Sequence, residues 1–252
     1  MGRHSRRKIK RADPGLADLP IDREENLVGP SRARDILSGI GWLSRQPAAF
    51  QDEVFKHSVP VQYAVGDVVY RLGDKPGGIY GIVSGALIAS MAPLGAVPHI
   101  LHVMTPGSWI GEGPYFARDA RRIDLRAALD TRAVYLPLDA MDLMTARDPL
   151  VLRNFVQILI INIDIVMRAS YDLQDPDEHR RIARALRRIM TLENTPIPLA
   201  QSALGMLANA SRKTVNAALQ RFEKAGWVKR GYRAITITNM KRLTQYAEGD
   251  AE

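Results

Sequence analysis

Three polar residues spaced four apart, Arg212, Asn216 and Gln220, have the types and the spacing needed to contact the edges of nucleic-acid bases. Residues four apart lie on one face of a helix, so these side chains would form one outward stripe, with Lys213 beside it. Arginine makes a bidentate contact to guanine, whereas asparagine and glutamine make one to adenine. A helix that offers such side chains from its first two turns suits the major groove of DNA. The spacing therefore predicts base contacts from Arg212, Lys213, Asn216 and Gln220.

The residues on the opposite side of this segment predict a helix packed on a core. The positions i, i+3, i+4 and i+7 are all apolar, and they are occupied by Val215, Ala218, Leu219 and Phe222. A shorter apolar helix is expected before it, from Leu199 to Leu207. Together the two segments predict a helix-turn-helix.

The turn between these two helices carries residues with the required backbone chemistry. Asn209 stands where a left-handed residue is needed, and asparagine tolerates that conformation better than any residue except glycine. Ser211 occupies the N-cap position of the second helix, where its hydroxyl can accept a backbone N–H. Gly226 is placed to end that helix.

A basic hairpin is predicted to follow. Residues 228–237 alternate around Gly231 and carry Lys229, Arg230 and Arg233, so they would form a wing that lies along phosphates. Short hydroxyl side chains also bind phosphate oxygens. The expected phosphate contacts are Ser211, Thr214, Lys229, Arg230 and Arg233.

The charge distribution favours the same end of the chain. The 252 residues have a net charge of +8, but residues 12–178 sum to −7 and residues 179–233 carry twelve basic against two acidic side chains. Residues 1–11 hold six basic residues and no acidic one. Positive charge concentrated on a folded segment is the expected footprint of a polyanionic partner, here double-stranded DNA.

Composition excludes several other classes of protein. The chain contains no cysteine, which rules out disulfides, iron–sulfur clusters, thiolate zinc sites and a cysteine nucleophile. Its most apolar stretch, residues 155–167, is interrupted by polar side chains and is too short to span a membrane. The basic start has no hydrophobic segment behind it, so it is no secretory signal. We therefore expect a cytoplasmic protein without a membrane contact.

An enzyme is disfavoured. His99, His102 and Glu112 are close in sequence, and a jelly-roll metalloenzyme is therefore one alternative. His99 and His102 are three apart on an expected strand, however, so they would point to opposite faces and share no metal. A second alternative is a ligand-sensing interaction module without sequence-specific DNA binding.

The elements that must position the basic segment change type along the chain. Two short helices are expected between Ala33 and Phe55. From Val59 to Leu136, short apolar runs alternate with Gly and Pro turns, which is typical of an antiparallel sandwich or barrel. One run extends from Ile79 to Met91, and Ala127 to Leu136 is expected to form one late strand.

A long helix is predicted after Pro149. Apolar residues recur at spacings of four and three and form a seam typical of a dimerisation helix: Leu152, Val156, Leu159, Ile163 and Val166. Proline disfavours the helical conformation in the residue before it, so Asp175-Pro176-Asp177 ends this helix and is the expected hinge.

The predicted fold class is α+β, with an N-terminal antiparallel, jelly-roll-like β-roll, a long dimerisation helix and a C-terminal winged helix-turn-helix. The expected boundaries are a flexible tail at 1–30, a sensing domain at 31–148, the dimer helix at 149–174, a hinge at 175–178 and a DNA-binding domain at 179–252.

This arrangement resembles the Crp/Fnr family of bacterial transcription regulators over about residues 33–240. The resemblance is carried by Gly66-Asp67, Gly73-Asp74, residues 80–85, Pro106-Gly107, Gly111-Glu112, residues 181–186 and, most specifically, residues 211–215 with Gly226. It implies a homodimer that binds palindromic DNA and acts on RNA polymerase. The family often has glutamate and arginine where this chain has Lys213 and Ala217, so the preferred operator should differ.

The resemblance also implies an effector pocket in the β-roll. In members that bind cyclic nucleotides, a Gly-Glu pair binds ribose, and an arginine followed by Ser or Thr binds the phosphate. Gly111 and Glu112 match the first part, while the sequence cannot decide between Arg121 and Arg122 for the second. Neither is followed by a hydroxyl residue, and Asp124 would place a negative charge near the phosphate.

Pro114 removes an amide donor from the same loop. A cyclic nucleotide is therefore possible but disfavoured, and no cofactor is certain. We expect either another small-molecule effector or none.

Overall fold

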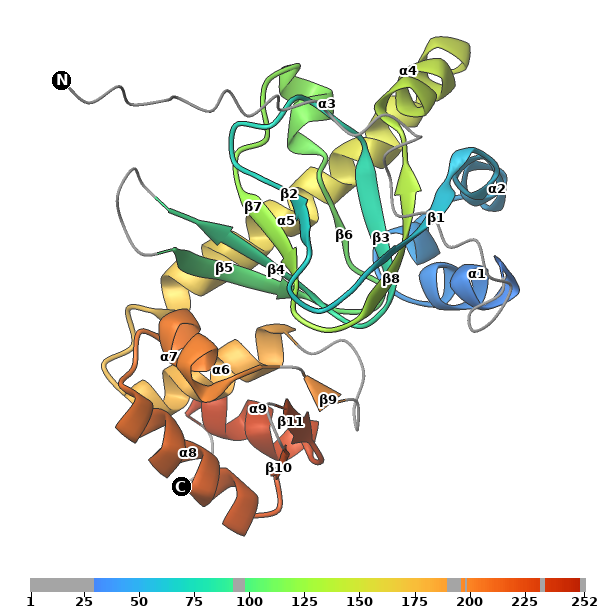
Figure 1. Cartoon of the computed structure of the whole chain (residues 1–252). Coiled ribbons are helices and arrows are strands. Elements are labelled where there is room, and N and C mark those ends of the chain that lie inside the picture. Colours follow the sequence, from blue (N-terminus) through green and yellow to red (C-terminus); the bar gives the residue numbers. More distant parts are fainter. Residues whose placement is uncertain (1–29, 93–97, 190–195, 198, 232–233, 250–252) are drawn as a thin grey trace, which may run out of the picture.

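The computed structural model describes residues 30–92, 98–189, 196–197, 199–231 and 234–249. The predicted tail, apart from its last residue, and Arg233 lie outside the described residues. Within them, a β-roll flanked by helices forms one half of the molecule, and a smaller helical half with a short sheet lies below it (Figure 1). The predicted α+β class is confirmed.

The β-roll consists of two four-stranded antiparallel sheets. One has the order β1-β8-β3-β6 and the other β2-β7-β4-β5. The bounds are β1 Val59–Tyr63, β2 Val68–Tyr70, β3 Ile79–Ser84, β4 Leu87–Met91, β5 His99–Met104, β6 Trp109–Ile110, β7 Asp124–Ala127 and β8 Thr131–Leu136. The flanking helices are α1 Pro30–Gly39, a 3-10 helix Leu43–Arg45, α2 Ala48–His57, α3 Gly113–Ala117 and α4 Leu138–Arg147.

Two predicted β segments pass from one sheet to the other. The run from Ile79 to Met91 is divided into β3 and β4, and the expected late strand, Ala127 to Leu136, begins at the last residue of β7 and otherwise corresponds to β8. The chain crosses between the two sheets after β3 and again after β7. These two crossings meet at Gly85, whose φ is +79°. A side chain there would come within 2.3 Å of the Asp130 carbonyl oxygen. Apolar patterning continues through both crossings because both sheets bury one face, so the pattern does not mark the break.

The long helix α5, Val151–Asp172, packs on the β-roll through one face only. Phe155 and Ile158 are buried there, and the Phe155 ring lies 6.1 Å from Trp42 and 5.4 Å from Phe50. The Trp42 indole N–H donates to the Asn154 carbonyl at 2.7 Å. These contacts fix α5 along the roll.

The predicted apolar seam lies mostly on the other face of α5. Leu152, Ile163 and Val166 are 40%, 42% and 64% exposed, and Val156 and Leu159 are half-buried. Exposed apolar side chains in a row are unfavourable in water, so this face is suited to a partner surface.

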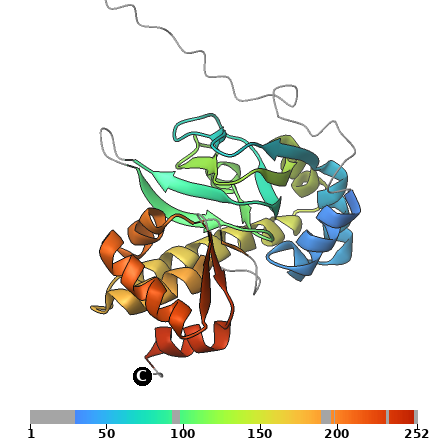
Figure 2. The same ribbon diagram turned by 60° about the horizontal axis from the view of Figure 1, so that its bottom comes forward.

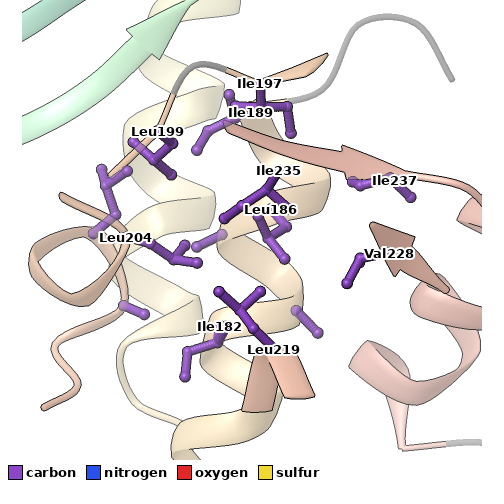
Figure 3. Packing of buried hydrophobic residues seen from close by; sticks show 14 of the residues in the cluster. Ile182, Leu186, Ile189, Ile197, Leu199, Leu204, Leu219, Val228, Ile235 and Ile237 are labelled. Carbon is purple, nitrogen blue, oxygen red and sulfur yellow. The ribbon is translucent and has the colours of Figure 1, made fainter. Parts of the chain in front are cut away.

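The C-terminal half has its own hydrophobic core. Its elements are α6 Glu178–Ile189, β9 Pro196–Ile197, α7 Gln201–Ala208, α8 Arg212–Lys224, β10 Val228–Gly231, β11 Ala234–Ile237 and α9 Met240–Glu248, with the sheet order β10-β11-β9. Ile182, Leu186 and Ile189 of α6 point into this core (Figure 3).

This core continues into the β-roll. Ala86 and Val103 belong to the same buried cluster as the C-terminal residues, and the Thr105 hydroxyl donates to the Ile189 carbonyl at 3.2 Å. The helix α7 lies against the strand pair β4 and β5, as two views show (Figures 1 and 2). The two halves therefore share buried surface within one chain.

Candidate DNA interface and effector pocket

The helix-turn-helix has the local geometry that its residues predict. Asn209 is left-handed, with φ 45° and ψ 55°, and Gly226 follows the end of α8 with φ +74°. The Ser211 hydroxyl caps α8 by accepting from the Thr214 N–H at 3.1 Å. These expectations are confirmed.

The packing of α8 separates a core face from a polar face. Val215, Ala218, Leu219 and Phe222 have no exposed surface. Arg212, Lys213 and Gln220 are exposed, and Asn216 is half-buried. The side chains predicted to contact bases thus lie away from the core, although their roles stay predictions.

Arg181, which the sequence analysis did not single out for function, holds the turn in place. Its Nε donates to the Ala208 carbonyl at 2.8 Å, and its Nη2 to the Asn209 carbonyl at 2.7 Å. Its Nη1 donates to the Asp175 carbonyl at 2.7 Å. One buried guanidinium therefore joins the linker after α5 to the turn that orients α8.

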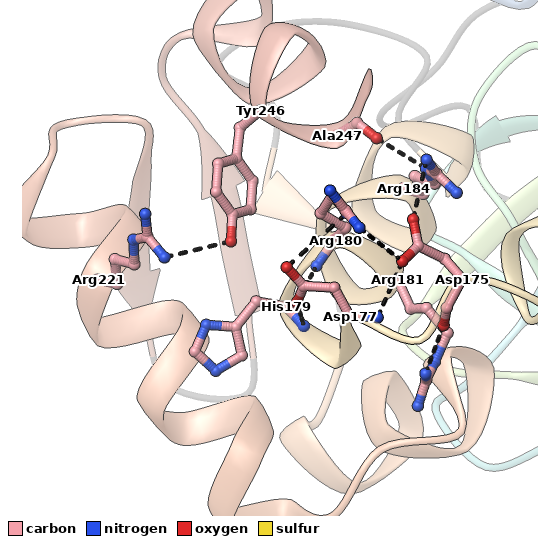
Figure 4. Close-up of polar contacts among 9 residues, drawn as sticks. All are labelled: Asp175, Asp177, His179, Arg180, Arg181, Arg184, Arg221, Tyr246 and Ala247. Atoms are coloured by element: carbon pink, nitrogen blue, oxygen red, sulfur yellow. Dashed lines mark hydrogen bonds and ion pairs between the residues drawn. The ribbon is translucent and has the colours of Figure 1, made fainter. Parts of the chain in front are cut away.

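The linker itself is fastened to α6. The Asp175 carboxylate forms ion pairs with Arg180 and Arg184, each with an N–O distance of 3.1 Å (Figure 4). Desolvation raises the pKa of Asp175, but the N–H of Asp177 and the two arginines together outweigh it, so the pKa is lowered. Arg184 also donates to the Ala247 carbonyl of α9 at 2.8 Å. Because its pKa is lowered, the Asp175 carboxylate is ionised and paired at neutral pH.

A second unforeseen network connects the wing to α8. Arg230 Nε donates to Glu223 Oε2 at 2.7 Å, and its backbone N–H donates to Glu223 Oε1 at 2.9 Å. Arg230 Nη1 also donates to Asn216 Oδ1 at 3.2 Å. The sequence signal for this pair was Glu223 itself, an acidic residue among basic ones near the predicted phosphate contact Arg230. Of the other wing cations, Lys229 is exposed.

The predicted effector residues line a cavity of about 220 Å³ between the β-roll and α5. Gly111, Glu112, Arg121 and Arg122 all contribute to its wall, together with Asn162 of α5. Asn162 donates to Glu112 Oε1 at 2.9 Å, so the pocket is joined to the long helix by a hydrogen bond.

The structure distinguishes the two arginines. Arg121 is buried; it donates to the carbonyls of Gly111 and Gly78, each at 2.9 Å, and lies 4.2 Å from the centre of the Tyr70 ring. The Arg122 side chain is 70% exposed. Of the two arginines, only Arg121 points into the β-roll, and its guanidinium is already hydrogen-bonded to backbone carbonyls.

One expectation about the pocket is wrong. Asp124 does not line the cavity; its carboxylate accepts the Leu72 N–H at 3.0 Å, because it begins β7 beside the turn after β2. Pro114 does line the cavity, in the first turn of α3.

The two histidines considered for a metal site differ in their exposure. No group of three His, Asp or Glu residues within the described part of the chain could hold a metal ion, and His99 is exposed whereas His102 is buried. None of the helices described is long and apolar enough to cross a membrane.

Comparisons with known proteins agree with this division. The family model of a cyclic nucleotide-binding domain matches residues 60–148, and that of a Crp-like helix-turn-helix domain matches residues 180–246. A CRP-like cAMP-activated global transcriptional regulator of Mycobacterium tuberculosis is 28% identical over 201 residues, which are 76% of this chain and 89% of that protein.

Two solved structures share the fold. FixK2 of Bradyrhizobium japonicum aligns with a TM-score of 0.65 at 19% identity, covering 75% of this chain and 96% of that one. The c-di-GMP responsive global regulator CLP of Xanthomonas campestris aligns with a TM-score of 0.58 at 20% identity, covering 76% and 99%.

Proposed function

The chain belongs to the Crp/Fnr family of DNA-binding transcription regulators, and we propose that it acts as a homodimer on a palindromic operator under the control of a small molecule. The observation that carries the proposal is α8, which is capped by Ser211 and exposes Arg212, Lys213 and Gln220 opposite a fully buried apolar face. That division suits a helix seated in the major groove.

Arg212 and Asn216 are proposed to select bases, with Lys213 and Gln220 beside them. Ser211, Thr214 and Lys229 contribute phosphate contacts. Arg233 belongs to the same proposed set but lies outside the described residues. Arg230 has a mixed role, since its guanidinium is held by Glu223 and in turn holds Asn216.

The dimer forms through the exposed seam of α5. Operator half-sites lie one helical turn apart, so two copies of α8 related by a two-fold axis would contact them together. Val166 belongs to the seam and also lines the effector cavity. A ligand there would touch the same helix that the partner protomer covers.

The effector is proposed to act through this cavity. The relative from M. tuberculosis is described as cAMP-activated, and the pocket retains Gly111 and Glu112. Against a cyclic nucleotide stand the occupied guanidinium of Arg121 and the missing hydroxyl residue. A ligand shifts a two-state equilibrium only by its differential affinity, so a poor phosphate site gives cyclic AMP little control.

The regulator would work in the cytoplasm with RNA polymerase as a further partner, and it would need no catalytic step of its own.

Selection of binding sites from genomic fragments, followed by fluorescence anisotropy on the selected duplex, tests the proposal. Arg212→Ala should weaken binding by about 1–3 kcal/mol per half-site and relax the preference at one base pair. Lys229→Ala should weaken all sequences alike and reduce the salt slope by about one per half-site. If Arg212→Ala proves neutral to sequence, or if no fragment is selected, the assignment is wrong.

A further inference from the structure

The effector cavity contains a polar group that no described residue satisfies. His102 lies on β5, lines the cavity and is 7% exposed. Its Nδ1 atom is buried and has no hydrogen-bond partner within the described residues. Native proteins pair nearly all of their buried polar atoms, because an unpaired one is costly. An orphaned nitrogen in a cavity wall is therefore suited to a ligand atom.

Most of the remaining wall is apolar. Met104, Ile110, Ile123 and Ile165 line the cavity, and Leu101 lies at its edge with partial exposure. An apolar cavity of about 150 Å³ is enough to take up benzene. At about 220 Å³ this one has room for an apolar body somewhat larger than a single ring.

The charged groups in the wall do not favour an anion. The Arg121 guanidinium already makes hydrogen bonds to two backbone carbonyls and lies over the Tyr70 ring. Glu112 is buried and accepts from Asn162, and its carboxylate would repel a second negative charge. Arg122 is exposed and has Asp119 3.9 Å away, so water screens it.

We propose that this cavity binds an uncharged, mostly apolar small molecule whose single hydroxyl group pairs with Nδ1 of His102. The inference rests on the proposed effector role of the cavity and names the chemical class of its ligand. A hydroxyl group can donate or accept, so it fits either tautomer of the imidazole. Burial, with a smaller contribution from the Arg188 guanidinium, lowers the pKa of His102 to about 4. The imidazole is therefore neutral at pH 7 and does not attract an anion.

The position of His102 connects such a ligand to the DNA-binding half. Arg188, whose charge acts on His102, belongs to α6 and forms a buried ion pair with Asp172 at the end of α5. A molecule held at His102 therefore lies near the ion pair that joins the last turn of α6 to the end of α5.

Two isosteric probes test the inference on the full chain by calorimetry. Benzyl alcohol and ethylbenzene have the same shape, and only the first carries a hydroxyl. Removing the imidazole in His102→Leu should raise the ratio of the benzyl alcohol Kd to the ethylbenzene Kd about fivefold, the usual size of one buried hydrogen bond. His99→Leu, on the exposed side of the same strand, should leave the ratio unchanged.

The comparison stays informative if the leucine variant folds poorly. His102→Asn keeps a hydrogen-bonding group and should shift the ratio less than leucine does. An unchanged ratio in both His102 variants overturns the inference. So does a wild-type protein that binds neither probe at millimolar concentration, or one that binds cyclic AMP at micromolar concentration instead.

Operator binding by the same preparations separates the two proposals. If the duplex still binds while the probe arm fails, only the ligand class is wrong. If no duplex binds, the proposed function fails.

Discussion

Replacing Glu223 with glutamine should make DNA binding more sensitive to salt, because this carboxylate neutralises Arg230, which is proposed to contact phosphate. Both oxygens of Glu223 are engaged, one by Arg230 Nε at 2.7 Å and one by the Arg230 backbone N–H at 2.9 Å. These hydrogen bonds lower the pKa of Glu223, so it is ionised at neutral pH. Glutamine keeps the size and an acceptor while removing the charge.

The expected change follows from counterion release. Each additional phosphate that a cation neutralises steepens the slope of log K against log salt by about 0.9. A dimer with two freed arginines would steepen by about 1.8. Between 50 and 200 mM salt, the affinity of Glu223→Gln should therefore fall about 12-fold more than that of the wild type. Preference at the base pair that Asn216 is proposed to contact should relax as well, since Arg230 holds the Asn216 amide oxygen.

Fluorescence anisotropy on the selected operator, at four or five salt concentrations, measures this slope. Glu248→Gln is the matched control: it makes the same change in net charge on α9, where Glu248 pairs with Arg187. A slope equal to that of the wild type would refute the reasoning about Arg230. An equal shift in both variants would attribute the effect to net charge alone.

Three further predictions follow from other contacts. Charged residues in place of Leu159 and Ile163 should split the dimer and abolish operator binding together, which sedimentation at micromolar concentration tests; a monomeric wild type contradicts the idea. Because the pKa of His102 is lowered to about 4 in the folded state, its contribution to stability is complete above about pH 6.5 and is lost towards pH 4, by up to about 1.4 kcal/mol per pH unit. Urea unfolding of the wild type and of His102→Asn across this range should therefore diverge, and parallel curves would contradict the assignment. Ser211→Ala should cost about 1 kcal/mol by removing the cap of α8, and a Ser211→Thr control should retain most of it; equal loss in both would show that the cap contributes nothing.

The helix-turn-helix was predictable from sequence because each of its features is local. The cap, the left-handed Asn209 and the four buried residues of α8 depend on neighbours within a few positions. The seam of α5 was predictable for the same reason, since helical spacing reports a face.

The features that the sequence did not reveal depend on residues far apart in the chain. Whether Arg121 or Arg122 points inward is decided by Gly78 and Tyr70, about forty or more positions earlier. Asp124 was expected near a phosphate, but the Leu72 N–H draws it to a turn. The place at which the late strand begins depends likewise on the crossing beside Gly85. Pairings of this kind are set by how the sheets close, which residue patterns do not encode.

The three hydrogen bonds of Arg181 have a mechanical consequence. Because one guanidinium binds both the linker at Asp175 and the turn at Asn209, the linker and the start of α8 would move together if the C-terminal half tilted. The helix α8 is about 20 Å long at 1.5 Å per residue. Tilting a helix of that length by about 10° about one end displaces its other end by about 3.5 Å, close to the spacing of one base-pair step. A tilt of that size would be enough to bring the two recognition helices of a dimer into or out of phase with the grooves, and the buried contacts of Ala86, Val103 and Thr105 with the C-terminal half would have to accommodate it.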